Sequence, residues 1–287
     1  MSYQRYFHTF WAQYLEEIPL AKEIYQLFQS KGEHFTCLDH DHMALRTFND
    51  PRVKLDVMMK PFVDAGYTPS ITYEFPLKRL FARHYEPPIP GAPKIFISHL
   101  LIERFSPEFQ KAVHGFLNKI PEGLLHNPAE LLTSKTSWGT LDYDTYHLLL
   151  KESQYAAWLY AYGYRANHFA VKVNALKHFK SCQEIDAFLK SKNHTMNMEN
   201  GEIKGSAAEL LEQSSIMAKD NDVVFSDGIH SVPSCYYEFT RRYPDKNGVL
   251  YPGFIAASAD KIFQSTDVVS DADSRDLELG QHHDKGQ

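Results

Sequence analysis

The chain has 287 residues, of which 43% are hydrophobic and 14% aromatic, so it is long enough to bury a sizeable core. Its formal net charge of −6, with no long basic run, argues against nucleic acid as the main partner. No stretch approaches the roughly 18 apolar residues of a membrane helix, and the chain begins without an apolar signal segment. We therefore expect no membrane partner.

The cysteines also indicate a cellular compartment. Cys37, Cys182 and Cys235 are scattered and odd in number, which fits neither a disulfide framework nor a CxxC zinc site. A reducing cytoplasm is therefore the expected location.

The first half of the chain predicts two helical segments and a set of strands. In residues 3–31, apolar side chains recur at three- and four-residue steps, which is typical of a helix, and Pro19 is expected to break or restart it. Residues 42–48 alternate like a strand. Asn49-Asp50-Pro51 then opens a helix that runs to about Ala65. Strand-like segments follow at 71–75, up to Arg83-Tyr85, and at 94–103.

The order of one strand, one helix and three strands recurs in the second half. Residues 167–173 form a strand and 178–192 a helix, and the clearest of the later strand-like pieces lie at 223–225 and 234–241. We interpret this pattern as a βαβββ unit used twice. The intervening residues 106–163 are predicted to be mostly helical.

Two of the predicted strands share a histidine-containing pattern. His42-Met43-Ala44-Leu45-Arg46 and His168-Phe169-Ala170-Val171-Lys172 each place alanine two residues and a cation four residues after the histidine. Side chains two apart on a strand share a face, so the histidine and the cation of each pattern point the same way. A third strand has the same geometry, with Glu238 in place of the histidine and Arg242 four residues later.

Two imidazoles and one carboxylate are a familiar donor set for a metal. On one side of a metal ion they form the facial arrangement of non-haem Fe(II) oxygenases, which leaves three positions open. A 2-oxo acid can occupy two of these positions and dioxygen the third. Arg46 lies roughly 13 Å along the strand from His42. Its planar guanidinium matches a carboxylate, so a dicarboxylic 2-oxo acid fits this arrangement better than a monoacid.

Other polar residues are assigned structural roles. A single histidine on an apolar strand is more often a core residue than a ligand, and we interpret His40 in this way. We also assign structural roles to His99 and Glu103, and solvated or ion-paired roles to Lys172 and Arg242. Glu238 has a structural alternative too, because a buried carboxylate could instead pair with an arginine.

The second ring nitrogens of the two histidines need hydrogen-bond acceptors if the histidines bind a metal. Asp39, Asp41 and Asn167 lie beside the histidines in the sequence. In a regular strand their side chains face the opposite side, so they are weak candidates for orienting the imidazoles.

An ordered set of motifs resembles a known family. DHMALRTF, AAWLYAYGYRANHFAVKVN, LLEQSS with FSDG, YYEFTRR and GFIAASADKIFQS together resemble the 2-oxoadipate dioxygenase/decarboxylase family, also called 2-hydroxyglutarate synthase. The resemblance runs from about residue 36 to 265. It implies Fe(II) held by His42, His168 and Glu238, with Arg46 holding the substrate. It also implies a main-chain contact to the substrate, which we place at Ala257.

The resemblance also implies a fold. We expect an α+β protein with vicinal-oxygen-chelate-like paired βαβββ modules, which form a mixed curved sheet around a metal site with added helices. The expected organisation is one catalytic domain over residues 1–265. It comprises a first module at 36–105, a helical insertion at 106–163 and a second module at 164–245. Residues 266–287 are expected to be a mobile acidic tail.

The function implied is an Fe(II)-dependent conversion of 2-oxoadipate and dioxygen to 2-hydroxyglutarate and carbon dioxide. Two alternatives stay open. A different divalent metal in the same site could support isomerase, lyase or hydrolase chemistry without oxygen. The paired modules could also bind a small anion without catalysis. The oligomeric state does not follow from the sequence.

Overall fold

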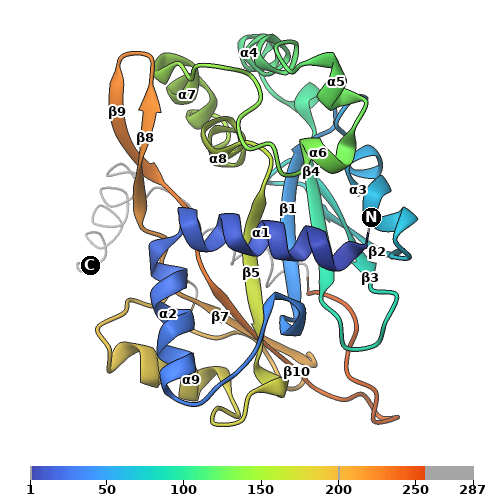
Figure 1. Cartoon of the computed structure of the whole chain (residues 1–287), viewed down its shortest axis with the longest axis vertical. Coiled ribbons are helices and arrows are strands. Elements are labelled where there is room, and N and C mark those ends of the chain that lie inside the picture. The colour runs from blue at the N-terminus through green and yellow to red at the C-terminus, as the bar shows by residue number, and fades with distance from the viewer. Residues whose placement is uncertain (1, 200, 256–287) are drawn as a thin grey trace, which may run out of the picture.

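The computed structural model describes residues 2–199 and 201–255 of the chain (Figure 1). Ala257 and the predicted tail at 266–287 lie outside the described residues. The described part is built on one eight-stranded sheet with the strand order β2-β3-β4-β1-β5-β10-β7-β6. These strands are β1 (His42–Phe48), β2 (Thr68–Phe75), β3 (Leu80–Glu86), β4 (Lys94–Leu100), β5 (Ala166–Lys172), β6 (Lys204–Ser206), β7 (Leu211–Ser215) and β10 (Glu238–Arg242).

Helices surround this sheet, and a separate hairpin projects from it. The described helices are α1 (Tyr3–Glu17), α2 (Pro19–Ser30), α3 (Leu55–Asp64), α4 (Pro107–Leu117), α5 (Glu122–Leu125), α6 (Pro128–Leu131), α7 (Tyr143–Leu150), α8 (Gln154–Tyr162) and α9 (Cys182–Lys190). The hairpin consists of β8 (Asp220–Phe225) and β9 (Gly228–Pro233). None of the described helices is long and apolar enough to cross a membrane.

The sheet consists of two βαβββ modules, as the sequence predicts. The first runs β1-α3-β2-β3-β4 and the second β5-α9-β6-β7-β10, and the modules meet where β1 pairs with β5. In each module the first and last strands are parallel neighbours, β1 with β4 and β5 with β10. The other pairings are antiparallel, so the sheet is mixed.

Several element predictions need correction, and among them the strand predicted at 234–241 begins only at Glu238. The predicted strand at 223–225 belongs to the β8–β9 hairpin rather than to the main sheet, and every second residue from Asp220 to Val224 is exposed. The helix predicted from residue 49 begins at Leu55, because residues 50–54 form a turn closed by bonds to the Asp50 carbonyl. The helix predicted from residue 178 begins at Cys182, where the Ser181 side chain caps it by accepting from the Glu184 amide.

Local signals predict other boundaries correctly. The first helical run is interrupted at the expected place, with α1 ending at Glu17 and α2 beginning at Pro19. Proline suits the first position of a helix because that position needs no amide donor. Gly163 joins α8 to β5 with a φ of 72°, and an added Cβ would lie 2.1 Å from the Lys135 carbonyl carbon. Only glycine fits there.

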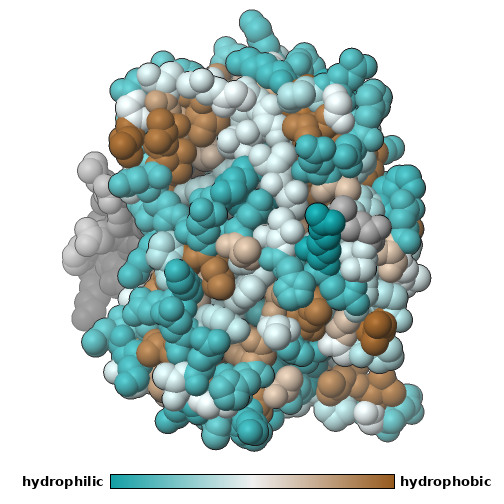
Figure 2. Space-filling view, viewed as in Figure 1, coloured by the Kyte–Doolittle hydropathy of each residue, from teal (hydrophilic) through white to brown (hydrophobic). Residues whose placement is uncertain are grey.

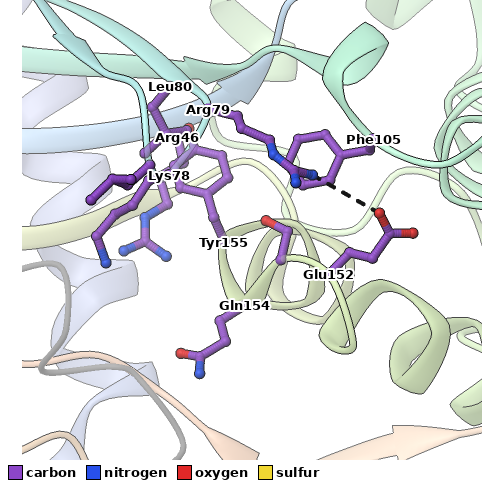
Figure 3. Close-up of a pocket in the computed structure, with 10 residues that line it drawn as sticks. Arg46, Lys78, Arg79, Leu80, Phe105, Glu152, Gln154 and Tyr155 are labelled. Carbon is purple, nitrogen blue, oxygen red and sulfur yellow. Dashed lines mark ion pairs between the residues drawn. The ribbon is translucent and has the colours of Figure 1, made fainter.

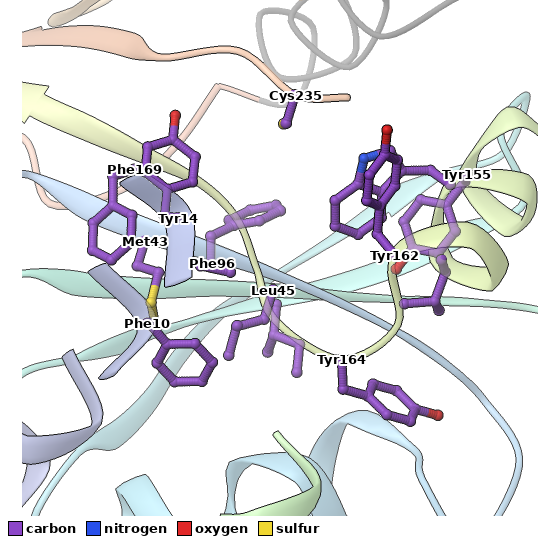
Figure 4. Close-up of a cluster of buried hydrophobic side chains, with 14 of the residues drawn as sticks. Phe10, Tyr14, Met43, Leu45, Phe96, Tyr155, Tyr162, Tyr164, Phe169 and Cys235 are labelled. Atoms are coloured by element: carbon purple, nitrogen blue, oxygen red, sulfur yellow. The ribbon is translucent and has the colours of Figure 1, made fainter. Parts of the chain in front are cut away.

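One face of the sheet is packed against aromatic residues of the N-terminal helices. Figure 1 shows α1 crossing this face, and Figure 4 shows part of the buried cluster. The Tyr14 and Phe169 rings lie 5.3 Å apart, and the Phe28 and Phe239 rings 5.9 Å apart. We call this the outer face. His42, His168 and Glu238 lie on the opposite, inner face, where α8 and residues 251–254 cover the sheet.

The surface is mixed in polarity. Figure 2 shows a mostly hydrophilic face with smaller apolar groups. Among the exposed apolar residues are Val224 and Ile229 of the hairpin, at 71% and 68% exposure.

His40 belongs to the outer-face core and not to the inner-face site. Its ring centroid lies 4.7 Å from that of Trp11 and 5.2 Å from that of Phe169. Its ring nitrogens lie 2.7 Å from the Tyr237 hydroxyl and 3.1 Å from the Thr36 carbonyl. The structural role predicted for His40 is therefore confirmed. Burial lowers the pKa of His40 to about 3.

This burial predicts acid sensitivity. An unfolded histidine has a pKa of about 6.5, so between about pH 3 and 6.5 the unfolded chain binds the proton that folded His40 excludes. As the pH is lowered from 6.5, His40 should therefore reduce the free energy of unfolding by about 1.4 kcal/mol per pH unit. Urea denaturation at pH 7, 6 and 5 should show a shallower decline in His40→Gln than in the wild type. Equal slopes would contradict this prediction, whatever the absolute stability of the variant.

Candidate metal centre

Three side chains predicted from the sequence converge on the inner face. His42 comes from β1, His168 from β5 and Glu238 from the start of β10, and all three are buried. One ligand atom from each can be chosen so that all three lie within 4.8 Å of one another. His42 Nε2 lies 3.5 Å from Glu238 Oε1, and His168 Nε2 lies 3.4 Å from Glu238 Oε2. This group is therefore able to hold a metal ion.

The strand register explains why alanine recurs two residues after each histidine. In the antiparallel pairing of β1 with β5, His42 lies opposite Ala170, and Ala44 lies opposite His168. On the other side of β5, Glu238 also pairs with Ala170. Ala170 is thus flanked by His42 and Glu238 on neighbouring strands. A methyl group there leaves the space between these two side chains open, since directly paired side chains begin only about 5 Å apart.

The second ring nitrogens of the histidines are held by residues that the sequence reasoning judged weak. His42 Nδ1 lies 2.9 Å from Asp41 Oδ1, and His168 Nδ1 lies 2.9 Å from Asn167 Oδ1. Because these oxygens are acceptors, each Nδ1 carries the proton and each Nε2 presents a lone pair. Such partners orient metal-binding histidines. The expectation that Asp41 and Asn167 face away was wrong.

Local irregularity explains this error. The register slips between Ala44 and Leu45, which pair with His168 and Ala166, so Asn167 is the extra residue of a β-bulge. A bulged residue leaves the strict alternation of a strand. Asp41 precedes the first residue of β1 and is equally free of the alternation. Asp39, the third residue judged weak, bonds Thr36 instead.

Glu238 is oriented by two further residues that sequence reasoning missed. Gln213 Nε2 donates to Glu238 Oε1 at 2.6 Å, and the Thr240 hydroxyl donates to the same oxygen at 2.7 Å. Gln213 lies on β7, which pairs with β10, and Thr240 lies two residues along the strand from Glu238. Gln213 belongs to the LLEQSS motif, so the resemblance marked the segment but not the role of the residue.

The pKa shifts of His168 and Glu238 agree in direction with the protonation states that a metal requires. Burial lowers the pKa of His168, which keeps the imidazole neutral. Burial alone would raise the pKa of Glu238, but its interactions with His42 and His168 outweigh burial and lower that pKa. A neutral imidazole and an ionised carboxylate are the ligand forms of these side chains.

The donor set fits a divalent ion. Ligand atoms about 2.1 Å from a metal lie roughly 3 Å apart in an octahedral site. The distances of 3.4 and 3.5 Å from each imidazole to a Glu238 oxygen are close to this spacing, and the group as a whole, which lies within 4.8 Å, would have to contract around an ion. Two nitrogens and one carboxylate oxygen are the donors of the facial triad of non-haem iron enzymes, but other divalent ions accept the same donors. The residues therefore fit Fe(II) without selecting it.

Arg46 lies on the same face of β1, at the edge of a cavity. Its guanidinium carbon lies 4.9 Å from the Tyr155 ring centroid and 5.0 Å from that of Trp158. Both rings are fixed, because the Tyr155 hydroxyl bonds the backbone of Thr47 and Ser98 and the Trp158 indole donates to the Ser234 carbonyl. Arg46 is thereby held by stacking on two anchored aromatic rings.

The cavity beside Arg46 has a volume of about 220 Å³. Lys78, Arg79 and Gln154 line it together with Arg46 and Tyr155, as Figure 3 shows. The three candidate ligands are not among its lining residues. Arg46 thus connects the inner face that carries the ligands to a cavity rich in cations, where an anion would be stabilised.

The other polar residues singled out from the sequence have structural partners. His99 Nδ1 accepts from the Leu55 amide, and Glu103 accepts from the Asn49 side chain, so neither joins the candidate ligands. Lys172 donates to the Gly91 carbonyl. Arg242 is buried and ion-paired with Asp41. The structural roles predicted for these residues agree with these contacts.

The position of Ala170 yields a test of the site. Ala170→Val would place two methyl groups between His42 and Glu238, while valine remains favourable in a strand. We expect the affinity for a divalent metal to fall by roughly 10-fold or more, because ligand placement tolerates only small shifts. Isothermal titration with Co²⁺ measures the affinity, and circular dichroism checks the fold. Ala170→Gly is the matched control and should bind as the wild type does; tight binding by the valine variant would contradict the prediction.

Comparison with known proteins identifies a family and several relatives. The model of a protein family described as 2-oxoadipate dioxygenase/decarboxylase matches residues 7–244. The chain is 31% identical over 277 residues to the 2-oxoadipate dioxygenase/decarboxylase, chloroplastic, of Arabidopsis thaliana, covering 88% of this chain and 74% of that protein. The 2-oxoadipate dioxygenase/decarboxylase, chloroplastic/amyloplastic, of Oryza sativa is also 31% identical, over 276 residues, covering 88% of this chain and 75% of that protein.

Solved structures give a consistent result. The hydroxyglutarate synthase of Oryza sativa, in complex with 2-oxoadipate, is similar with a TM-score of 0.84 and 30% identity, over 92% of this chain and 91% of that chain. A Shewanella frigidimarina protein, provisionally described as a hydrolase, has a TM-score of 0.82 and 44% identity, over 88% of this chain and 97% of that chain. A Ralstonia eutropha protein, provisionally placed in the glyoxalase superfamily, has a TM-score of 0.70 and 20% identity, over 86% of this chain and 83% of that chain. The last likeness concerns the fold alone, and with it the predicted vicinal-oxygen-chelate-like fold class is confirmed.

Proposed function

The chain belongs to the 2-oxoadipate dioxygenase/decarboxylase family, and from this premise we propose that it converts 2-oxoadipate and dioxygen to 2-hydroxyglutarate and carbon dioxide with Fe(II) held by His42, His168 and Glu238. The family predicted from the sequence motifs is thus confirmed. Membership makes the chain an oxidoreductase whose substrate is a small molecule. The iron, the individual ligands and the use of oxygen by this chain are the proposal.

One observation carries the assignment of the ligands. Two imidazole Nε2 atoms and a carboxylate from three different strands face one another within 4.8 Å, and separate side chains hold each of them. The side chains of His42, His168 and Glu238 would bind the ion. Asp41 and Asn167 accept hydrogen bonds from the Nδ1 atoms of the two histidines and so keep the protons there. Bound Fe(II) supplies coordination of the 2-oxo acid and activation of dioxygen.

The protein itself supplies orientation and exclusion of water. All three ligand residues are at most 5% exposed. Arg46, about four strand residues or roughly 13 Å along β1 from His42, is positioned to bind the far carboxylate of a six-carbon diacid. The stacked Tyr155 and Trp158 rings prevent the guanidinium from folding away. A main-chain contact from Ala257 stays a prediction, because that residue lies outside the described residues.

The proposed reaction is balanced without a further substrate. The atoms of 2-oxoadipate and one dioxygen molecule equal those of 2-hydroxyglutarate and one carbon dioxide molecule, so the conversion needs no external reductant. The 2-oxo acid supplies the electrons when it loses its carboxylate. A cytoplasmic location also stays a prediction, since the curated relatives from plants bear chloroplastic in their names.

The first experiment is anaerobic reconstitution with Fe(II), followed by addition of oxygen and 2-oxoadipate. We expect oxygen uptake and 2-hydroxyglutarate in equal amounts without an added reductant, because the reaction is balanced as written. An oxygen electrode and mass spectrometry measure the two quantities. His42→Ala should lose turnover and tight metal binding together, because one of three ligands is removed.

The outcomes separate the open alternatives. Turnover that proceeds without oxygen, or with Zn²⁺ in place of Fe(II), would replace the oxygenase by an isomerase, lyase or hydrolase on the same scaffold. Substrate binding without any turnover would leave a small-anion binding module. Tight Fe(II) binding without oxygen uptake on 2-oxoadipate would indicate that the substrate is another 2-oxo acid.

Arg46 gives a separate prediction about substrate choice. Arg46→Ala should lower kcat/KM for 2-oxoadipate by roughly 10- to 100-fold, the worth of a charge-assisted hydrogen bond. The same variant should change kcat/KM little for 2-oxohexanoate, a monoacid of equal length. Arg79→Ala is the control, because Arg79 lines the same cavity but faces Glu152 at 4.0 Å. Equal losses of kcat/KM on both substrates would show that Arg46 does not bind the far carboxylate.

A further inference from the structure

A buried ion pair joins the start of the first module to the end of the second. Arg242, the last residue of β10, donates through Nε to Asp41 Oδ2 at 2.7 Å and through a terminal nitrogen to Asp41 Oδ1 at 2.9 Å. Both side chains are at most 5% exposed. Burial alone would raise the pKa of Asp41, but the charge of Arg242 outweighs it and holds that pKa well below its usual range. Asp41 is therefore a carboxylate, and the same Oδ1 accepts from His42 Nδ1.

The other side of the same guanidinium holds a segment near the end of the described chain. Its remaining terminal nitrogen donates to the Tyr251 carbonyl at 2.9 Å and to the Gly253 carbonyl at 2.7 Å. The guanidinium carbon also lies 5.0 Å from the Phe254 ring centroid. We call residues 251–254 the closing segment. The Arg242 guanidinium thus makes four hydrogen bonds, two to Asp41 and two to the closing segment.

The closing segment covers the candidate metal ligand. Phe254 is 5% exposed, and its ring stands edge-on to His42 with the centroids 4.8 Å apart. The Phe254 ring also contacts Phe96, at 5.1 Å between centroids. On the first module, the Phe254 amide donates to the Tyr73 hydroxyl at 3.0 Å, and that hydroxyl lies 2.9 Å from His84 Nδ1. Both modules therefore hold the segment over His42.

We propose that Arg242 is a positioning residue that couples the seating of residues 251–254 over the site to the orientation of His42. The proposal rests on the proposed function, since it requires His42 to bind the metal. Asp41 holds the His42 ring and its tautomer, and Arg242 holds Asp41. The closing segment stabilises Arg242 in this position. By linkage, metal binding and seating of the segment must then favour each other to the same extent.

The geometry requires arginine rather than a positive charge alone. The planar fork directs two parallel donors to one carboxylate and still has donors for two carbonyls on its other side. Lysine has three donors on a single nitrogen and cannot span both partners. Arg242→Lys therefore preserves the charge and removes the bridge. Arg241→Lys, on the adjacent residue whose guanidinium stacks on Tyr243, is the matched control.

The experiment measures two quantities in the same protein. Anaerobic titration with Fe²⁺ against a competing chelator gives the metal affinity, and amide hydrogen exchange by mass spectrometry reports on residues 251–254. In the wild type, Fe²⁺ should slow exchange in the closing segment. In Arg242→Lys, affinity should fall roughly 10- to 100-fold, and exchange should no longer respond to the metal that does bind. Arg241→Lys should behave as the wild type does.

A variant on the other side of the segment separates seating from coupling. Tyr73→Phe removes the acceptor of the Phe254 amide but leaves the contacts of Arg242 with Asp41. Exchange in the closing segment should be faster in this variant and should still slow when Fe²⁺ binds. If the role of Arg242 were purely structural, Arg242→Lys would lower the stability of the protein but would not change the effect of Fe²⁺ on exchange in the closing segment.

Each outcome decides the proposal. If wild-type protein binds Fe²⁺ but exchange in residues 251–254 does not change, the coupling is wrong even if Arg242→Lys fails to fold. Wild-type affinity and a wild-type exchange response in Arg242→Lys would also overturn it. If the wild type binds no divalent metal, the metal site of the proposed function fails, and the inference fails with it. The first two results leave the proposed function standing.

Discussion

The antiparallel register between β1 and β5 is the constraint on which the site depends. It sets each histidine opposite the alanine of the other strand, and it brings the two Nε2 atoms toward the same region of the inner face. A slip of one residue would turn every side chain of one strand to the other face. The outer-face packing opposes such a slip, because Met43 and Phe169 are buried there and the Phe169 ring packs against Tyr14 of α1. The core on one face thereby maintains the geometry of the site on the other.

Around this pairing the structure separates two tasks. Asp41, Asn167, Gln213 and Thr240 fix the candidate ligands, each through a hydrogen bond of 2.6–2.9 Å. Tyr155 and Trp158 instead fix Arg46, through ring stacking. Metal binding and recognition of the far carboxylate can therefore change independently. A relative could accept another 2-oxo acid by altering the aromatic residues of α8 while keeping the ligands.

The residues that the sequence predicted are those with a local signal. His42 and His168 lie in matched patterns whose period of two indicates a strand, and Pro19 marks a helix boundary by its chemistry. Asp41 and Asn167 were judged weak partners because a regular strand was assumed. Asp41 lies before the start of β1 and Asn167 lies in a bulge, and neither departure from alternation leaves a mark in a single sequence. The partnership of Arg242 with Asp41 spans 201 residues, and no local rule connects positions that far apart. The hairpin was misassigned because its alternation shows strand character without showing the partner strand.

The long separation between Asp41 and Arg242 has a consequence for how the protein forms. The strands and helix of the first module can pair once residue 100 has left the ribosome, but the inner face then lacks one histidine, the carboxylate and the cation that neutralises Asp41. Contacts between distant positions form late because closing a long loop costs entropy. During synthesis the first module therefore carries an unpaired acidic group next to a histidine. The complete set of candidate ligands therefore belongs to the nearly finished chain and is assembled late in folding.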